Sequence, residues 1–219
     1  MKKRSLKTSK EKEQRMAETA EGVQVQRKQR SPADEELLKR VNEGDSVAFN
    51  MIVKRYKLRL LNFVFRFLGD RDQAEELVQE TFLRVFRERR NHERISNFST
   101  WIFTIAGNLA KSELRRRKRW RFFSIDQQEP EEGAEFEIPD ESQRPDDLAH
   151  DRMIERAVRK AMETLSPKYR EAVILRDIQG FAYEEIAEII GCPVGTVKSR
   201  VNRARLRLQE ELKDWMRST

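Results

Sequence analysis

The stretch FAYEEIAEIIGCPVGTVKSRVNRARLRL, residues 181–208, decides the fold of the C-terminal part of this chain. Residues 182–190 place isoleucines and alanines at helical spacing with glutamates between them, which predicts an amphipathic helix. Gly191 can adopt the left-handed conformation that ends a helix. Pro193 suits the first turn of a second helix, where no backbone N–H is needed. The stretch therefore predicts a helix-turn-helix.

The second of these helices separates an apolar face from a polar face. At about 100° per residue, one stripe contains Val194, Val197, Val201, Ala204 and Leu208. The opposite face carries Ser199, Asn202 and Arg203, with Thr196, Lys198 and Arg200 nearer its edges. Such a helix fits a DNA major groove, because it offers hydrogen-bonding tips between basic edges. A surface helix with solvated charges is the alternative, but the Gly–Pro frame favours DNA recognition.

The composition limits the classes of protein to which the chain can belong. Its 219 residues have a formal net charge of +7, which suits a polyanionic partner. The single cysteine, Cys192, excludes an intrachain disulfide, and His92 and His150 lie far apart, so we expect no zinc site and no cofactor. A glycine-rich phosphate loop and a paired nucleophile and base are both missing from the sequence. We therefore expect no enzymatic activity.

Hydropathy bears on location. No apolar run approaches membrane-spanning length, and the N-terminus lacks the apolar core of a signal peptide. We therefore expect a cytoplasmic protein with no direct membrane insertion.

Helical periodicity organises the N-terminal half. Residues 1–30 are charged and almost without large apolar side chains, so we expect a disordered basic extension. Periodicity then runs from residue 31 to about 121, and Asp70 is placed to cap a helix with Gln73 as its capping-box partner. The expected helices lie before a break at residues 42–45, after that break to Tyr56, and over about 57–68, 70–90 and 99–119.

The composition then changes sharply. Residues 126–147 contain ten acids and one base, Arg144, together with prolines, which indicates a flexible acidic linker. Helical periodicity returns near residue 147, with a helix that starts at Ser166-Pro167 and ends at Gly180. We predict an all-α fold of two small domains, the second made of four short helices. The predicted boundaries are 31–121 for the N-terminal domain, 122–150 for the linker and 151–217 for the C-terminal domain.

The helix after Asp70 has apolar residues on two faces. Its core-facing stripe contains Ala74, Leu77, Val78, Thr81 and Val85. Leu83 and Phe86 fall outside that stripe, next to Glu76 and Gln79. An apolar patch mixed with polar and acidic groups is typical of a protein-binding surface. A helix packed on two sides within its own bundle would give the same spacing, and the sequence leaves both readings open.

The helix over residues 99–119 ends in a strongly basic run. The segment KSELRRRKRWR, residues 111–121, carries seven positive charges in eleven residues, more than a helix dipole needs. Such a cluster binds phosphates by counterion release. The polar loop before it, residues 91–100, contains Asn97, Phe98, Ser99 and Thr100. Polar side chains beside an aromatic suit an extruded single-stranded base, although an ordinary turn is an equal alternative.

Three segments together resemble bacterial RNA polymerase sigma factors of the sigma-70 family, of the compact extracytoplasmic-function type. They are AEELVQETFLRVF (74–86), FSTWIFTIAGNLAKSELRRRKR (98–119) and LSPKYREAVILRDIQGFAYEEIAEIIGCPVGTVKSRVNRARLRL (165–208). The resemblance covers about residues 33–213. It implies a transcription initiation factor that binds core RNA polymerase and directs it to promoters. The alternative function is that of a stand-alone helix-turn-helix transcriptional regulator.

The resemblance also implies roles for individual residues. Contact with the clamp helices of the largest polymerase subunit falls to Leu77, Gln79, Glu80, Leu83 and Phe86. Melting and reading of the −10 promoter element fall to Ser96, Asn97, Phe98, Ser99, Thr100, Asn108, Lys111, Arg115 and Arg116. In duplex −35 DNA, the residues implied at bases are Ser199, Asn202 and Arg203, and those at phosphates are Arg176, Thr196, Lys198 and Arg200. The flap of the second-largest subunit and an anti-sigma factor are further implied partners.

Overall fold

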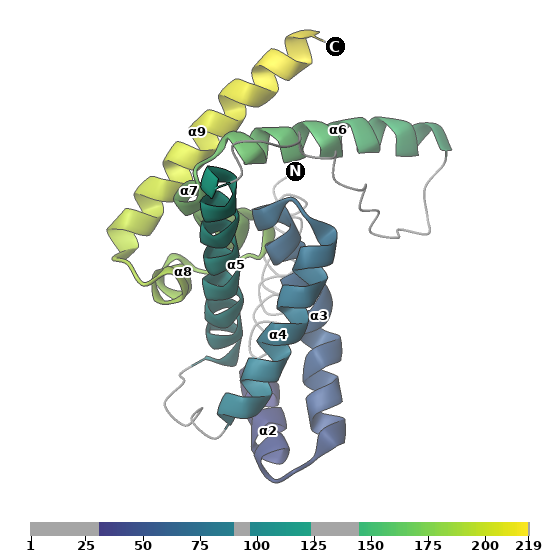
Figure 1. Ribbon diagram of the computed structural model, residues 1–219, viewed down its shortest axis with the longest axis vertical. Coiled ribbons are helices and arrows are strands. Elements are labelled where there is room, and N and C mark those ends of the chain that lie inside the picture. The colour runs from purple at the N-terminus through teal and green to yellow at the C-terminus, as the bar shows by residue number, and fades with distance from the viewer. Residues whose placement is uncertain (1–30, 90–96, 124–144, 219) are drawn as a thin grey trace, which may run out of the picture.

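The computed structural model describes residues 31–89, 97–123 and 145–218, and these are helical with no strand among them (Figure 1). The N-terminal helices are α2 (Ser31–Asn42), α3 (Ser46–Leu68), α4 (Arg71–Glu88) and α5 (Phe98–Phe123). The C-terminal helices are α6 (Pro145–Thr164), α7 (Pro167–Val173) with a π-helical turn η2 (Ile174–Ile178), α8 (Tyr183–Ile190) and α9 (Val194–Ser218). The predicted all-α, two-domain fold is confirmed. Residues 1–30 and most of the predicted linker lie outside the described residues.

Helix ends in the N-terminal domain follow local capping chemistry. The Asp45 carboxylate accepts hydrogen bonds from the N–H groups of Val47 (2.8 Å) and Ala48 (3.1 Å). Gly69, at φ 77°, ends α3. Asp70 accepts from the Gln73 N–H at 3.0 Å and so begins α4 as predicted, but the Gln73 side chain donates to Glu76, which leaves the capping box half formed. The sequence interpretation correctly placed these three helix ends.

One predicted break is wrong. Residues 46–68 form the single helix α3, where the sequence interpretation had separate helices to Tyr56 and from Lys57. No glycine or proline interrupts this stretch, and Ile52, Tyr56 and Leu60 are all buried along it, so one continuous face packs on the domain core. The helix is therefore continuous for 23 residues.

Aromatic rings lie at the centre of the core of the N-terminal domain. Phe63 and Phe67 on α3 are stacked with ring centroids 6.3 Å apart, and Phe63 meets Phe103 of α5 edge-on at 5.4 Å. α2 is fastened to this bundle by Asp34, which is buried and accepts a hydrogen bond from the Tyr56 hydroxyl at 2.6 Å. The Phe63–Phe103 contact thus packs α5 against α3, and the Asp34–Tyr56 bond joins α2 to α3.

The C-terminal domain is built around α9, which packs against α7, α8 and α6. Leu165, Ile174 and Ile186 are buried around it. The prediction of four short helices is wrong for two of them, because α6 has 20 residues and α9 continues for 25 residues to Ser218. These two long helices lie beside each other (Figure 1). Gly180 follows η2 at φ 76° and ends that segment where the sequence placed the end.

The two domains pack directly against each other. α8 and η2 of the C-terminal domain lie against α5 and α3 of the N-terminal domain (Figure 1). Buried residues of both domains form one continuous apolar cluster. In the ranges that the structure describes, no helix has the length and apolar character to cross a membrane.

Candidate nucleic-acid interface

The turn between α8 and α9 is closed by main-chain hydrogen bonds. Gly191 takes the left-handed conformation at φ 71°, and its N–H donates to the Ala187 carbonyl at 2.9 Å. The Pro193 carbonyl accepts from Thr196 at 2.8 Å and from Val197 at 3.1 Å, so α9 forms its first turn at once. Pro193 lies just before the helix rather than inside its first turn. The predicted helix–turn–helix geometry is confirmed.

α9 divides into the two predicted faces. Val197, Val201 and Ala204 are buried against the rest of the domain, whereas Ser199, Asn202 and Arg203 are exposed. The Ser199 hydroxyl donates to the Thr196 carbonyl at 2.9 Å, and the Arg203 guanidinium approaches the Tyr169 hydroxyl at 3.4 Å. That cation lowers the pKa of the Tyr169 phenol. The polar face of α9 is therefore open to a partner.

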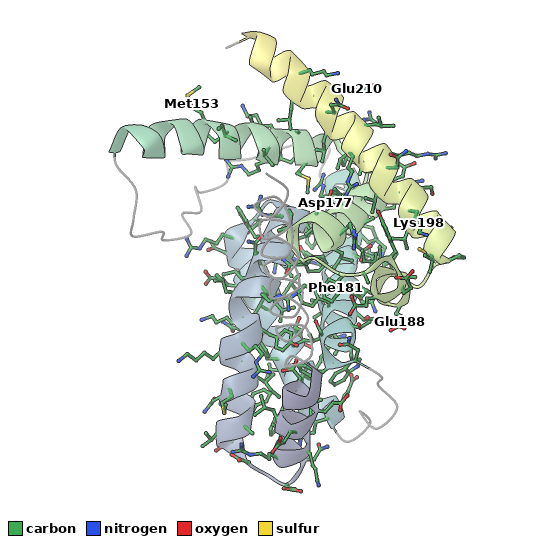
Figure 2. The ribbon with its side chains drawn as sticks, turned by 180° about the vertical axis from the view of Figure 1, so that it is seen from behind. Met153, Asp177, Phe181, Glu188, Lys198 and Glu210 are labelled. Carbon is green, nitrogen blue, oxygen red and sulfur yellow. The ribbon has the colours of Figure 1, made fainter. Side chains whose placement is uncertain are left out.

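The edges of this face carry the predicted basic residues, which differ in how far they are buried. Lys198 is exposed, with its ammonium 5.7 Å from the Tyr183 ring centroid (Figure 2). Arg176 is half-buried, stacks on the same ring at 4.4 Å and donates to the Phe181 carbonyl at 2.7 Å. Thr196 and Arg200 are half-buried. Lys198 is thus an exposed cation beside the Tyr183 ring, whereas Arg176 also stabilises the segment that leads into α8.

The basic end of α5 is partly neutralised within the N-terminal domain. Glu113 is buried and accepts from Arg116 at 2.7 Å and from Arg117 at 3.0 Å, and Arg117 also pairs with Asp70 at 2.8 Å. Hydrogen bonding by these two arginines lowers the pKa of the Glu113 carboxyl, Arg116 contributing most. The predicted phosphate-binding role of Arg116 therefore competes with an internal carboxylate.

Other charges of the same run remain exposed. Arg115 donates to the Ser112 hydroxyl at 3.0 Å and is exposed, as are Lys118 and Arg119. Asn108 is exposed on the same helix. Residues 108, 115 and 119 lie on one side of α5, because they are separated by about two and three helical turns. This stripe is the part of the basic run that can meet phosphates.

Residues 98–100 belong to the first turn of α5, so the predicted loop ends at Asn97. Asn97 caps this turn by accepting from the N–H groups of Ser99 (2.9 Å) and Thr100 (3.4 Å). Phe98 is buried, its ring 5.2 Å from Tyr56 and 5.9 Å from Trp101. Phe98 thus serves the core in this conformation, and Ser96 lies outside the described residues.

The apolar patch on α4 is exposed. Leu83 keeps 50% and Phe86 43% of its surface accessible, while Val78, Phe82 and Val85 are buried on the other side. Near the patch, Leu77 and Glu80 are half-buried and Gln79 is exposed. The Arg84 guanidinium, 2.9 Å away, lowers the pKa of the Glu80 carboxyl. Burial of both faces within the bundle, the alternative left open by the sequence, is wrong.

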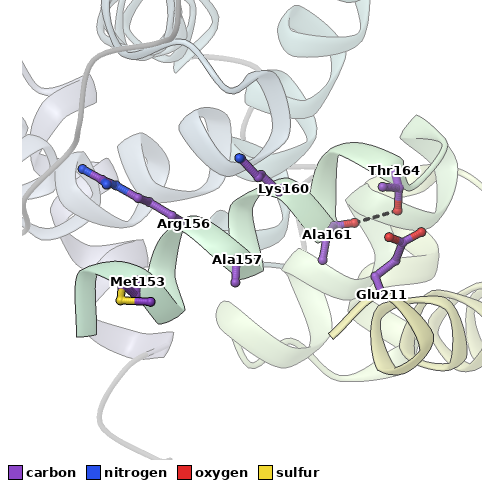
Figure 3. Close-up of a pocket in the computed structure, with 7 residues that line it drawn as sticks. All are labelled: Met153, Arg156, Ala157, Lys160, Ala161, Thr164 and Glu211. Atoms are coloured by element: carbon purple, nitrogen blue, oxygen red, sulfur yellow. Dashed lines mark hydrogen bonds between the residues drawn. The ribbon is translucent and has the colours of Figure 1, made fainter. Parts of the chain in front are cut away.

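A groove between α6 and α9 was not anticipated from the sequence. It has a volume of about 330 Å³ and is shown in Figure 3. Its lining residues are Met153, Arg156, Ala157, Lys160, Ala161, Thr164 and Glu211. Ala157 and Ala161 lie one helical turn apart, and their small side chains leave space between α6 and α9. This pair of alanines at helical spacing was the only feature of the sequence that could have indicated the groove. Among the described residues, no cluster of histidine, cysteine and carboxylate side chains could hold a metal ion.

Comparison with known proteins identifies the two domains. Residues 52–120 match the family model described as Sigma-70 region 2, and residues 155–208 match Sigma-70, region 4. The RNA polymerase sigma-H factor of Pseudomonas aeruginosa is 35% identical over 188 residues, which cover 84% of this chain and 96% of that protein. The ECF RNA polymerase sigma-E factor of Escherichia coli (strain K12) is 34% identical with the same coverage of each chain.

A solved structure is similar over most of the chain. The sigma factor RpoE from Bartonella quintana, solved with the anti-sigma factor NepR, is 34% identical with a TM-score of 0.62. The match covers 75% of this chain and 96% of that one. The chain therefore belongs to the sigma-70 family of RNA polymerase sigma factors, in the extracytoplasmic-function subfamily, and functions in promoter recognition.

Proposed function

We propose that α9 reads the −35 promoter element as duplex DNA, with Ser199, Asn202 and Arg203 at the base edges. The observation that carries this proposal is the exposed polar face of α9 opposite the buried Val201 stripe. Arginine can donate two hydrogen bonds to one guanine, and asparagine pairs in the same way with adenine. The phosphates on either side would be held by Arg176, Thr196, Lys198 and Arg200.

The −10 element belongs, in this proposal, to the N-terminal end and the exposed stripe of α5. Asn97 and Ser99 lie at the end of the helix, and Asn108 and Arg115 lie along the stripe. A melted strand can bind here through its phosphates and through base edges. The remaining residues assigned to this element are Ser96, Phe98, Thr100, Lys111 and Arg116. Phe98 and Thr100 act by fixing the first turn of α5, because both are buried.

Two apolar surfaces are suited to the polymerase. The patch around Leu83 and Phe86, with Leu77, Gln79 and Glu80, would bind the clamp helices of the largest subunit. The groove between α6 and α9 is a concave surface lined by two alanines on α6, with the basic side chains of Arg156 and Lys160 on the α6 side and the acidic Glu211 on the α9 side. We assign it to the flap of the second-largest subunit, because an apolar projection with acidic flanks would fit the alanines and the basic side chains.

The proposal also covers how the chain is regulated and whether it is an enzyme. RpoE of Bartonella quintana was solved with an anti-sigma factor, and we propose that an anti-sigma factor also restrains this chain. The family consists of DNA-binding initiation factors, and we propose that the chain has no catalytic activity of its own and acts in the cytoplasm. A stand-alone helix-turn-helix regulator is not favoured, because that function would not require the region 2 domain.

Transcription from a randomised promoter library tests the assignment. Core polymerase with the full chain is supplied with templates randomised at the −35 and −10 elements, and run-off transcripts are sequenced. We expect enrichment of one −35 and one −10 sequence, which core polymerase alone does not give. Tight binding to duplex DNA without association with polymerase would contradict the proposal. An enriched −35 sequence with an unselected −10 region would contradict the α5 assignment alone.

A further inference from the structure

Tyr169 of α7 lies beside the polar face of α9. Its hydroxyl oxygen is 3.4 Å from the Nη1 atom of Arg203, the residue proposed to read a base edge. A guanidinium can only donate hydrogen bonds, so the phenol oxygen is the acceptor in this contact. The lowered pKa of the Tyr169 phenol agrees with this direction, because a hydrogen bond donated to the oxygen favours the phenolate. Tyr169 therefore presents an acceptor to an exposed side chain of the polar face.

The position of Tyr169 is fixed by its own helix. Its N–H donates to the Ser166 carbonyl at 2.9 Å in the first turn of α7, and its half-buried ring packs against the apolar cluster. The next residue, Arg170, donates to the carbonyls of Phe67 (2.9 Å) and Leu165 (3.1 Å). α7 also packs along α9. The hydroxyl is thus held in place relative to the backbone of α9, whereas an arginine side chain rotates about several bonds.

The phenol orients Arg203 without neutralising it. Within the ranges that the structure describes, the Tyr169 hydroxyl is the one hydrogen-bond partner of the Arg203 guanidinium. Arg205, two positions further along α9, instead donates to both carboxylate oxygens of Asp177, which is labelled in Figure 2. A carboxylate competes with DNA for an arginine, but a neutral phenol leaves its charge in place. One N–H of Arg203 meets the phenol, and the other donors remain for the two bonds that arginine forms with guanine.

We propose that Tyr169 is a positioning residue for −35 recognition, which orients the Arg203 guanidinium and so strengthens its preference for one base pair. This inference rests on the proposed function, because that function places Arg203 at a base edge. A side chain that is oriented before binding loses less rotational freedom on the DNA, which corresponds to about three- to tenfold in affinity for the correct base pair. Without the phenol, the guanidinium can turn to neighbouring phosphates, which carry no sequence information.

Removal of a single oxygen atom tests this role. Tyr169→Phe keeps the ring that packs on the domain and loses only the acceptor. The matched control is Tyr183→Phe on α8, because the Tyr183 ring lies beside Lys198, at the other edge of the polar face. A double-mutant cycle adds Arg203→Ala, alone and together with Tyr169→Phe. Each full-length chain is combined with core polymerase, and run-off transcripts from promoters substituted at each −35 position give the discrimination at that position.

We expect Tyr169→Phe to lose about three- to tenfold discrimination at the same −35 position that Arg203→Ala affects, with an unchanged temperature of unfolding. In the Arg203→Ala background the same substitution should have no further effect, because a positioning residue acts only through the residue that it orients. Tyr183→Phe should leave discrimination at that position unchanged.

Two results would overturn the positioning role while leaving the proposed function intact. One is a loss that is uniform over all −35 positions, or that persists in the Arg203→Ala background, since Tyr169 would then contact a DNA phosphate itself. The other is full discrimination in Tyr169→Phe at the position where Arg203→Ala loses it. Failure of the proposed function is distinguishable, because Arg203→Ala would then keep the base preference of the unmodified chain at every −35 position.

Discussion

The Lys111 ammonium on α5 and the Glu171 carboxylate on α7 lie 3.1 Å apart, on opposite sides of the junction between the domains. Burial raises the pKa of the Glu171 carboxyl, and the charges of Lys111 and of Arg200 partly offset that rise. The pair thus joins two parts of the chain that are 60 positions apart in sequence.

This pair makes stability depend on pH. A carboxyl with a raised pKa in the folded state binds its proton more readily there, so its contribution is complete below its usual pKa of 4.5 and is lost as pH rises through the raised value. We expect the midpoint of urea unfolding above pH 4.5 to change less favourably with rising pH in the unmodified chain than in Glu171→Gln, because carboxyls with a lowered pKa, such as Glu113, act in the opposite direction in both proteins. Glu171→Gln should lack this component. Parallel curves for the two proteins would contradict the expectation.

Arg203→Ala should relax −35 recognition at one position. The side chain is exposed at the centre of the polar face of α9, and its loss should cost about 1–3 kcal/mol of binding free energy at one base pair. Fluorescence anisotropy with duplexes substituted at each −35 position measures this. A uniform loss across all duplexes would reassign Arg203 to a phosphate.

Lys198→Ala should act differently, because Lys198 lies at the edge of the same face. A phosphate contact contributes to all sequences alike and releases about one counterion. We expect weaker binding to every duplex and a salt dependence shallower by about one unit in the slope of log K against log salt. Titrations at several salt concentrations give that slope, and a loss confined to one promoter sequence would contradict the phosphate assignment.

Leu83→Ala combined with Phe86→Ala should impair binding to core polymerase while leaving the fold intact. Leu83 keeps 50% and Phe86 43% of its surface accessible, so the double substitution removes the edge-on contact of Phe86 with Phe49 but opens no enclosed cavity. A polymerase pull-down and thermal unfolding measure the two effects. The comparison variant is Phe82→Ala on the buried side of α4, which should lose about 3–5 kcal/mol of stability. Comparable unfolding in the double variant would mean that the patch supports the core.

Local chemistry explains what the sequence could predict. Asp70 and Gly191 act on helix ends through atoms within four residues, so their roles are visible in a short window. The buried Val197 and exposed Arg203 follow from helical periodicity alone. Periodicity gives the direction of a face but not what covers it, which is why the exposure of Leu83 had to come from the structure.

Long-range packing explains what could not be predicted. Phe103 and Phe181 meet across 78 positions of chain, and neither has a local pattern that points to the other. Glu171 resembles any acid on a solvated helix, yet it is buried at the junction of the domains, where it pairs with a lysine from the other domain. The occupied amide of Asn97 likewise depends on Glu185, 88 positions later. The interface between the domains is therefore a property of tertiary structure.

Two arginines at the interface each donate a hydrogen bond to a main-chain carbonyl at the C-terminal end of a helical segment in the opposite domain. Arg170 meets a carbonyl in the last turn of α3, and Arg59 meets the carbonyl that follows η2. Such carbonyls carry partial negative charge whatever side chain their residue bears. Substitution at Phe67 or Gln179 therefore leaves both acceptors in place, whereas loss of either guanidinium removes a contact. Amino-acid substitutions during evolution can therefore change the strength of domain association mainly at the two donor residues, Arg170 and Arg59.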